Sequence, residues 1–348
     1  MRRPWWTLGF LAALLASIMA TLCTAQRAVD QYMGDWQGTV TVGGKEQPVA
    51  VFMIPLGNGR YEMKCVSEFN KRVPVLYDVR GFLRNGEFRA VDAVPLDVSR
   101  VLAPTDNGVV VDVSLWSGKL VDGTLQGTIA GKIKGTFKLT KTQRTSPTLG
   151  QKPPAGAIVL FDGKSLEAWQ PRSGKGKVQW RLVGGDAMEV KGGDIVTKES
   201  FGDMKLHLEF RTPYMPTSFG QARGNSGVYI QGRYEIQVLD SYGLAGLDNE
   251  CGGIYKVAAP AVNMCFPPLQ WQTYDITFYA PRFDAQGRKV ANARITVVHN
   301  GVTIHDNLEL PGITPGGISK KEAPTGPLLL QDHGNPVQYR NIWLVKLK

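Results

Sequence analysis

The stretch RGNSGVYIQGRYEIQVLDS, Arg223 to Ser241, decides the fold of the longer part of this 348-residue chain. Residues 225–230 and 234–239 each mix β-branched and aromatic residues with polar ones, as strands do. Between them stands Gln231-Gly232-Arg233, a glycine-containing triplet typical of a tight turn. The stretch therefore predicts a β-hairpin.

The returning strand of this hairpin carries the polar residues of most chemical interest. Because strand side chains alternate between faces, Glu235 and Gln237 share one face and the apolar residues between them share the other. Asp240 breaks this parity, so a bulge near 238–239 is needed to bring it beside Glu235. Two carboxylates can act as general acid and general base on a sugar, and an amide can hydrogen-bond its hydroxyls. The simpler interpretation is the polar outer face of an ordinary strand.

Short β-like runs continue through the region from Ala157 to the C-terminus. Turn residues separate them, and the whole predicts an antiparallel two-sheet sandwich of about 190 residues. His207 lies on the polar face of its predicted strand, so we expect it to be solvated. The expected strands besides the hairpin are 204–211, 271–279, 293–299, 302–304, 326–331 and 338–346.

Residues 26–140 predict a smaller antiparallel β domain, a barrel or a sandwich, because turn signals recur every eight to twelve residues. No cluster of His, Asp or Cys gives it a catalytic site, so we expect an accessory role. Core packing of Trp36, Tyr61 and Trp116 is expected, with a sugar-stacking face as the alternative. Its expected strands include 38–42, 48–54, 61–66 and 109–115, and a hairpin follows at 123–139. Residues 141–156 contain three prolines and predict a semi-extended linker.

The first 25 residues have the features of a signal peptide. Arg2 and Arg3 precede an apolar run from Leu8 to Leu22, and small residues follow it. The run is short for a membrane span. We therefore expect cleavage after Ala25, export to the periplasm or the cell exterior, and no membrane span in the mature protein. A retained anchor is the alternative.

The charge of the chain is basic but evenly spread. The formal net charge of +10 falls to +8 when Arg2 and Arg3 are removed, and residues 26–150 and 151–348 each keep an excess of +4. Nucleic-acid binding calls for a dense basic stripe, and the sequence contains none. We expect no nucleic-acid partner, and the oligomeric state is left open.

Three cysteines remain after cleavage, and their spacing fits neither a zinc site nor a redox pair. In an exported protein Cys251 and Cys265 could form a disulfide, with Cys65 left free. The alternative is that all three are free thiols.

From Ala157 to the C-terminus a series of motifs follows in order: FDGKSLEAW, GGDIVTKESFGDMKLHLEFR, GNSGVYIQGRYEIQVLDSYG, CGGIYKVAAP, WQTYDITFYAPRFD, NGVTIHDN and GPLLLQDHGNPVQYRNIW. In these motifs, their order and their spacing, this part of the chain resembles the 3-keto-disaccharide hydrolase family. The resemblance implies a concanavalin-like jelly-roll sandwich in an exported enzyme that acts on glycosides whose sugar carries a ketone at C3.

The segment EIQVLD is also similar to the catalytic strand of laminarinase-type glycoside hydrolases, which share the jelly-roll. Glu235 matches their nucleophile and Asp240 their acid, but Gln237 replaces the middle aspartate. A glutamine cannot exchange a proton or tune its neighbours by charge, which weakens a conventional endo-glucanase reading. The departure indicates different chemistry on a similar scaffold.

A C3 ketone makes such chemistry accessible, because it acidifies the hydrogen on C2. A base removes that proton, and the C1 substituent leaves with help from an acid. We expect Glu235 to be the base and Asp240 or His333 the acid. His333 lies in a Gly/Asn/Pro loop, where functional residues are common. The alternative is that His333 only hydrogen-bonds the backbone of its loop.

Further residues are expected to bind the sugar. The polar ones would orient hydroxyls or hold the enolate oxygen, and the aromatic ones would stack on the ring, with core packing as the alternative. They are Arg223, Asn225, Gln237, Tyr229, Tyr255 and Trp271. The sequence requires no cofactor. A structural Ca²⁺ could bind loop residues such as Asp194, Asp203 and Asp332, but no ligand loop of defined spacing identifies its site.

The leading hypothesis is an exported enzyme that cleaves 3-keto-glycosides, by elimination or by hydrolysis, with a carbohydrate as its partner. The alternative is a carbohydrate-binding, lectin-like protein without activity, because the jelly-roll serves both classes.

Overall fold

A computed structural model describes residues 30–90, 115–131 and 133–347. Within these ranges the regular structure is β, apart from the short 3₁₀ helix η2 (Gly220–Ala222). The prediction of an all-β protein is confirmed. The described residues include no helix of the length and apolarity that a membrane span requires. The predicted signal peptide lies outside them.

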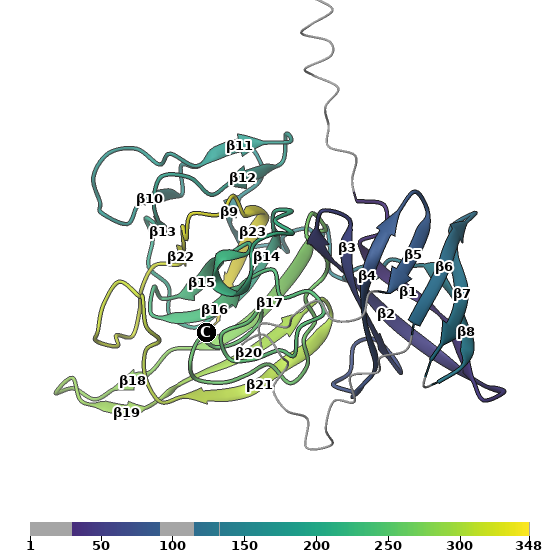
Figure 1. The fold of residues 1–348 in the computed structure, drawn as a ribbon. Coiled ribbons are helices and arrows are strands. Elements are labelled where there is room, and N and C mark those ends of the chain that lie inside the picture. Colours follow the sequence, from purple (N-terminus) through teal and green to yellow (C-terminus); the bar gives the residue numbers. More distant parts are fainter. Residues whose placement is uncertain (1–29, 91–114, 132, 348) are drawn as a thin grey trace, which may run out of the picture. The chain divides into compact units, whose positions relative to one another are not determined.

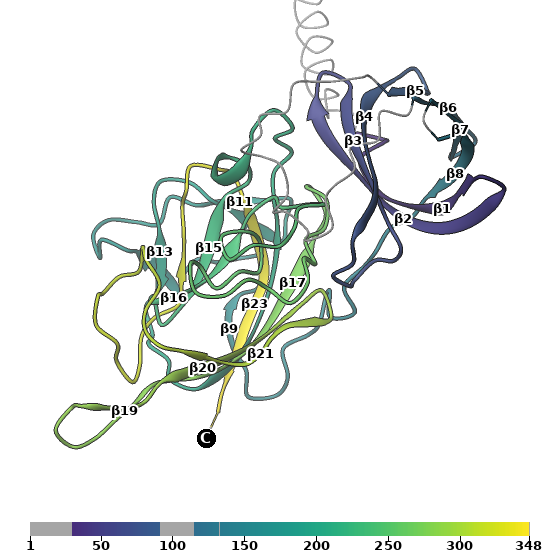
Figure 2. The same ribbon diagram turned by 60° about the horizontal axis from the view of Figure 1, so that its bottom comes forward.

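Strands β1 to β8 form a closed antiparallel barrel, in which each strand pairs with the next and β8 pairs with β1. Figure 2 shows these strands as a ring. Trp36, Tyr61 and Trp116 are buried, as core packing predicts. The predicted strand 109–115 lies outside the described residues except for Leu115. The strands are β1 (Gly34–Val42), β2 (Lys45–Gly57), β3 (Arg60–Val66), β4 (Val75–Arg84), β5 (Glu87–Ala90), β6 (Leu115–Val121), β7 (Thr124–Ala130) and β8 (Gly135–Lys141).

The rest of the chain forms a sandwich of two sheets, drawn in teal to yellow in Figure 1. Between them lies one large apolar cluster, to which Leu208, Phe210, Ile236 and Ile276 belong. The five-stranded sheet has the order β10 (Trp169–Pro171), β13 (Ile195–Thr197), β22 (Leu329–Leu330), β15 (Ser226–Ile230) and β16 (Tyr234–Val238). The larger sheet has the order β11 (Arg181–Val183), β12 (Ala187–Glu189), β23 (Gln338–Lys346), β14 (Met204–Arg211), β17 (Gln272–Tyr279), β20 (Ala293–His299) and β21 (Val302–Leu310). In addition β9 (Ile158–Phe161) pairs with β23, and β18 (Arg282–Phe283) pairs with β19 (Lys289–Ala291).

The segment that follows β8 lies against the outer face of the larger sheet. Thr148 Oγ1 donates a hydrogen bond to Asp275 Oδ2 at 2.6 Å, and the Gly150 amide donates to Glu209 Oε1 at 2.6 Å. His207 Nδ1 lies 2.6 Å from Asp275 Oδ1, and the residue is only 1% exposed. The prediction that His207 is solvated is therefore wrong, because neighbouring chain covers the polar face of its strand. The domain boundaries expected at 140 and 157 stay predictions.

Candidate active site on the five-stranded sheet

The β15–β16 hairpin forms where the sequence predicts it. Tyr229 pairs with Glu235 and Gly227 with Gln237 across the two strands. Val228, Ile230, Ile236 and Val238 belong to the apolar cluster between the sheets, so the polar residues of β16 lie on the opposite face. Gln231 and Gly232 in the turn both have positive φ, of 53° and 62°, as a tight hairpin turn requires.

The strand alternation breaks just after β16. Leu239 belongs to the same apolar cluster as its neighbour Val238, so two successive residues face the core where β16 ends. The β15–β16 pairing has no register shift over residues 226–238, and the predicted bulge near 238–239 stays a prediction. Asp240 is 3% exposed, and its Oδ2 accepts a hydrogen bond from Arg223 Nε at 2.5 Å. The two sequence-predicted residues thus form a buried ion pair. In this structure Asp240 therefore fixes the position of the Arg223 guanidinium.

Glu235 has the surroundings of a proton-transfer group. It is 3% exposed, and its Oε2 accepts a hydrogen bond from the Tyr229 hydroxyl at 2.7 Å. Burial raises the pKa of the Glu235 carboxyl to about 7; the Tyr229 hydrogen bond opposes this, and the negative charge of Asp194 adds to it. A carboxyl with a pKa near neutrality can both accept and return a proton at physiological pH.

Tyr229 is placed differently from its predicted role. Its side chain is 1% exposed and packs with Val196, Leu329 and Ile318, so no ring face is open to a sugar. Its hydroxyl instead faces Glu235. Tyr255 stays a candidate platform, because its side chain is half-buried and its amide donates to the Glu235 carbonyl at 3.2 Å.

Side-chain amides continue the polar face beyond Glu235. Gln237 Nε2 donates to Gln221 Oε1 at 3.1 Å, and Asn225 Nδ2 donates to the Gln221 carbonyl at 2.8 Å. Gln221 in turn donates to the Asn249 carbonyl at 2.7 Å. Sequence reasoning missed Gln221 and Asn249, because a single-turn 3₁₀ helix and a loop carry no periodic pattern.

Two of the residues expected to bind the sugar each have a buried polar atom without a hydrogen-bond partner within the described residues. The atoms are Asn225 Oδ1, an acceptor, and Arg223 Nη2, a donor. Buried polar atoms are normally paired, so unpaired ones call for an explanation. A sugar hydroxyl or a developing oxyanion could pair with them.

The loop that contains His333 is tied to the same sheet through other residues. Asp332 Oδ2 accepts from the Gly193 amide at 2.7 Å, and Asn335 Oδ1 accepts from the Asn225 amide at 2.8 Å. The His333 side chain is exposed. The structure thus places the loop near Asn225 without joining His333 to Glu235 by a contact.

A second loop, residues 314–318, was not predicted to take part and lies against Glu235 and Tyr229. The Glu235 amide donates to Thr314 Oγ1 at 2.9 Å. Arg172 donates to the carbonyls of Gly316 and Gly317, at 3.0 and 2.7 Å. Arg172 also pairs with Asp194 at 2.8 Å. These contacts link residues far apart in the sequence, which is why no local pattern signalled them.

Trp271 does not join the site. It lies beside β14 and β23 of the larger sheet, with the guanidinium carbons of Arg211 and Arg340 at 4.7 and 4.2 Å from its ring centre. Its indole is therefore engaged by two cations rather than open to a sugar.

The predicted disulfide is also absent. Cys251 and Cys265 are buried free thiols, as is Cys65. Both lie in the apolar cluster between the sheets, where a thiol packs as a small apolar side chain.

The possible structural Ca²⁺ stays a prediction. Among the described residues no group of three His, Cys, Asp or Glu side chains could hold a metal ion. Asp203 is paired with Arg282, and Asp194 with Arg172.

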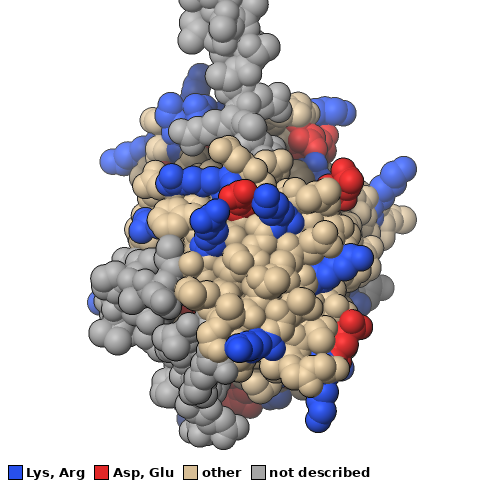
Figure 3. Space-filling view, turned by 45° about the vertical axis from the view of Figure 1, so that its right-hand side comes forward, with Lys and Arg blue, Asp and Glu red and all other residues tan. Residues whose placement is uncertain are grey.

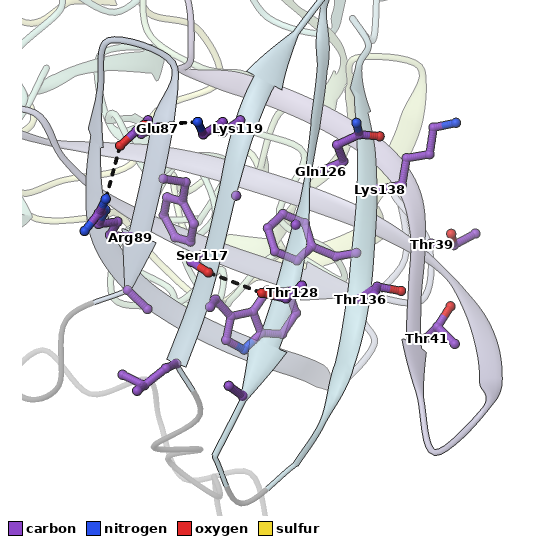
Figure 4. Close-up of a pocket in the computed structure, with 18 of the residues that line it drawn as sticks. Thr39, Thr41, Glu87, Arg89, Ser117, Lys119, Gln126, Thr128, Thr136 and Lys138 are labelled. Atoms are coloured by element: carbon purple, nitrogen blue, oxygen red, sulfur yellow. Dashed lines mark hydrogen bonds and ion pairs between the residues drawn. The ribbon is translucent and has the colours of Figure 1, made fainter.

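The barrel has a cavity of about 1190 Å³, and none of these residues is among the described residues that line it. Its walls come from β5 to β8 and the β1–β2 hairpin, and Figure 4 shows Ser117 facing Thr128 and Glu87 facing Lys119 and Arg89. The described residues that line the cavity include no histidine or cysteine.

Figure 3 shows basic side chains scattered among uncharged ones on one face of the molecule, without a continuous stripe.

Comparison with known proteins identifies the family of the sandwich region. The family model of the 3-keto-alpha-glucoside-1,2-lyase-like domain matches residues 156–345. The chain belongs to this family. The match contains the hairpin, η2 and both loops of the candidate site, and it excludes the barrel.

Three solved structures from Parabacteroides distasonis are similar to this member of the lyase-like family, and each is described as a candidate glycosyl hydrolase. The first is 39% identical, covers 56% of this chain and 86% of its own, and has a TM-score of 0.53. The second is 18% identical with a TM-score of 0.43, over 56% of this chain and 95% of its own. The third is 22% identical with a TM-score of 0.39, and it covers 55% of this chain and 99% of its own. No curated protein matches the chain.

Proposed function

We propose that this protein cleaves glycosides whose sugar carries a ketone at C3, by removing the C2 proton and expelling the C1 substituent. Family membership and the similarity to candidate glycosyl hydrolases support an enzyme that acts on glycosidic bonds. The observation that carries the finer proposal is the buried Glu235 with a pKa of about 7. Such a carboxylate is a suitable base for a C–H bond acidified by a neighbouring ketone.

The reaction divides into two balanced steps. Glu235 takes the C2 hydrogen as a proton, and its bonding electrons form an enolate with the C3 ketone. The enolate then collapses to a C1=C2 double bond and a C3 ketone, while the C1–O bond breaks and the leaving oxygen gains a proton. Water adds to the enone afterwards if the overall outcome is hydrolysis. A carboxylate nucleophile is not needed, which accords with Gln237 at the middle position of the strand.

Other side chains have roles that follow from their unpaired atoms. Arg223 Nη2 is a buried N–H donor without a partner in the described residues, and it suits a developing oxyanion. Asn225 Oδ1 suits a sugar hydroxyl, and Gln237 lies one alternation from Glu235 on the same face. The acid that protonates the leaving group is proposed to be Asp240 or His333, and exposure favours His333.

Turnover of matched substrates tests this proposal. The mature protein is incubated with a 3-keto-glucoside and with the same glucoside lacking the ketone, and aglycone release is followed. Cleavage of the keto substrate alone is expected. Cleavage of both glycosides would favour an ordinary hydrolase, and saturable binding without cleavage would favour the lectin-like alternative.

Two glutamine variants locate the chemistry. Glu235→Gln is expected to lose at least 100-fold in turnover while keeping substrate affinity, because the amide keeps the shape but cannot take a proton. Glu322→Gln is the matched control, since Glu322 also accepts a hydrogen bond from a buried tyrosine of this hairpin, Tyr234, at 2.8 Å. Equal losses in both variants would remove Glu235 from the mechanism.

We also propose that the enzyme is exported and works outside the cytoplasm. The support is the charged, apolar and small-residue pattern of the first 25 residues. Mass spectrometry of protein recovered from the periplasm or medium should show a chain that begins at Gln26. Recovery of the full-length chain in membranes would show that the segment is retained.

A further inference from the structure

The two oxygens of the Glu235 carboxyl have different surroundings. Oε2 accepts the hydrogen bond of the Tyr229 hydroxyl at 2.7 Å. Oε1 lies over Gly227, where an added Cβ would stand 2.5 Å from this oxygen. The described residues provide Oε1 with no hydrogen-bond partner. One oxygen is therefore occupied and the other is free.

Tyr229, which donates to Oε2, is held in place by several neighbours. Gln331 Nε2 donates to its hydroxyl oxygen at 3.3 Å, and its ring packs with Val196, Leu329 and Ile318. A Cβ at Gly316 would stand 2.5 Å from the hydroxyl, so the 314–318 loop also abuts it. The hydroxyl hydrogen can reach Glu235 at 2.7 Å or the Pro315 carbonyl at 3.2 Å. The shorter, charge-assisted bond to Glu235 is the stronger of the two.

We propose that Tyr229 is the positioning residue of Glu235, holding Oε2 so that Oε1, above the bare Gly227, meets the C2 hydrogen of the substrate. This inference rests on the proposed function, because it names the oxygen that acts as the base. Gly227 contributes by leaving space for the carboxylate oxygen. Tyr229 is not a catalytic residue in this account, since it acts through Glu235.

The charges around the carboxyl give this arrangement a measurable consequence. Asp194 and Tyr339 interact electrostatically with Glu235, and Arg172 with Tyr229. Burial and Asp194 raise the Glu235 pKa, whereas the Tyr229 hydrogen bond lowers it by favouring the ionised form. Burial and Glu235 also raise the Tyr229 pKa far above its ordinary value, so the hydroxyl keeps its proton. Removing that hydroxyl must therefore raise the Glu235 pKa further.

The test compares two tyrosine-to-phenylalanine variants of the same hairpin. Tyr229→Phe removes the hydroxyl that holds Glu235, and Tyr234→Phe removes an equally buried hydroxyl that bonds to Glu322. The Glu235 titration is followed by ¹³C NMR of protein labelled at glutamate Cδ, with Glu235→Gln used to assign its resonance. We expect Tyr229→Phe to raise the midpoint by about one pH unit, and Tyr234→Phe to leave it in place.

Kinetics on the 3-keto-glucoside form the second arm. Tyr229→Phe should lower kcat by about 10- to 100-fold with little change in KM. The pH at which activity is half lost on the acidic side should rise by the same amount as the Glu235 midpoint measured by NMR. An unchanged Glu235 midpoint, or equal shifts in both variants, would overturn the inference. If wild-type protein cleaves no keto substrate, the proposed function fails, and the NMR arm still decides whether Tyr229 holds Glu235.

Discussion

Lowering the pH from 7.5 to 5.5 should inactivate this enzyme far more than an ordinary glutamate base would allow. Glu235 acts as a base only when ionised, and burial raises its pKa from the usual 4.5 to about 7. The ionised fraction then falls from about 76% to about 3%, so kcat/KM falls about 25-fold, whereas an unperturbed glutamate gives a fall of about 1.1-fold.

The assay is initial aglycone release from a 3-keto-glucoside at low substrate concentration, measured between pH 5 and 8.5. Because kcat/KM reports the free enzyme, its midpoint should lie near pH 7. Circular dichroism at each pH shows whether the protein stays folded. The residual activity of Glu235→Gln should not fall between pH 7.5 and 5.5, because the variant lacks the titrating carboxyl. A flat profile down to pH 5.5 in a folded enzyme would refute the role given to Glu235.

Three further predictions concern stability and binding. Glu235→Gln should stabilise the fold by about 1 to 3 kcal/mol at pH 8, because the folded-state pKa of Glu235 is raised and the ionised carboxylate therefore destabilises the folded state. The gain should fall below about 1 kcal/mol at pH 5 and vanish only below the unfolded pKa of about 4.5; urea unfolding at pH 8 and pH 5 checks this. Asp240→Ala should destabilise by about 3 kcal/mol, since the Arg223 guanidinium is left buried without its partner, and an effect under 0.5 kcal/mol in urea would contradict the buried ion pair. Trp271→Ala should lower stability by about 2 kcal/mol and leave KM unchanged, because two guanidinium groups pack on its indole; a tenfold rise in KM would restore it as a sugar platform.

The hairpin and its faces were predictable because period-two alternation is a local property of a strand. Glu235 and Gln237 share the face opposite the core, and the parity break before Asp240 was visible as two successive apolar residues. The family resemblance predicted the two-sheet architecture beyond what alternation alone could. The family match over residues 156–345 confirms the resemblance, and the two sheets of the structure confirm the architecture.

What sequence reasoning missed depends on contacts between distant segments. His207 lies on the polar face of its strand as predicted, but it is buried against Asp275 and Trp343 of the two neighbouring strands. Tyr229 lies on the expected face of its strand. The 314–318 loop covers its ring, however, and its hydroxyl donates a hydrogen bond to Glu235. Trp271 is drawn to two arginines on β14 and β23. No local pattern reports what another loop will cover.

The most direct test of the account follows the C2 hydrogen itself. A 3-keto-glucoside deuterated at C2 is incubated with the enzyme in ordinary water, and the sugar product is examined by mass spectrometry and NMR. Abstraction by Glu235 predicts loss of deuterium from C2 and slower turnover of the deuterated substrate, by about two- to sevenfold if proton removal limits the rate. Complete retention of deuterium at C2 in the cleaved sugar would show that C1 is attacked directly, and would contradict the elimination.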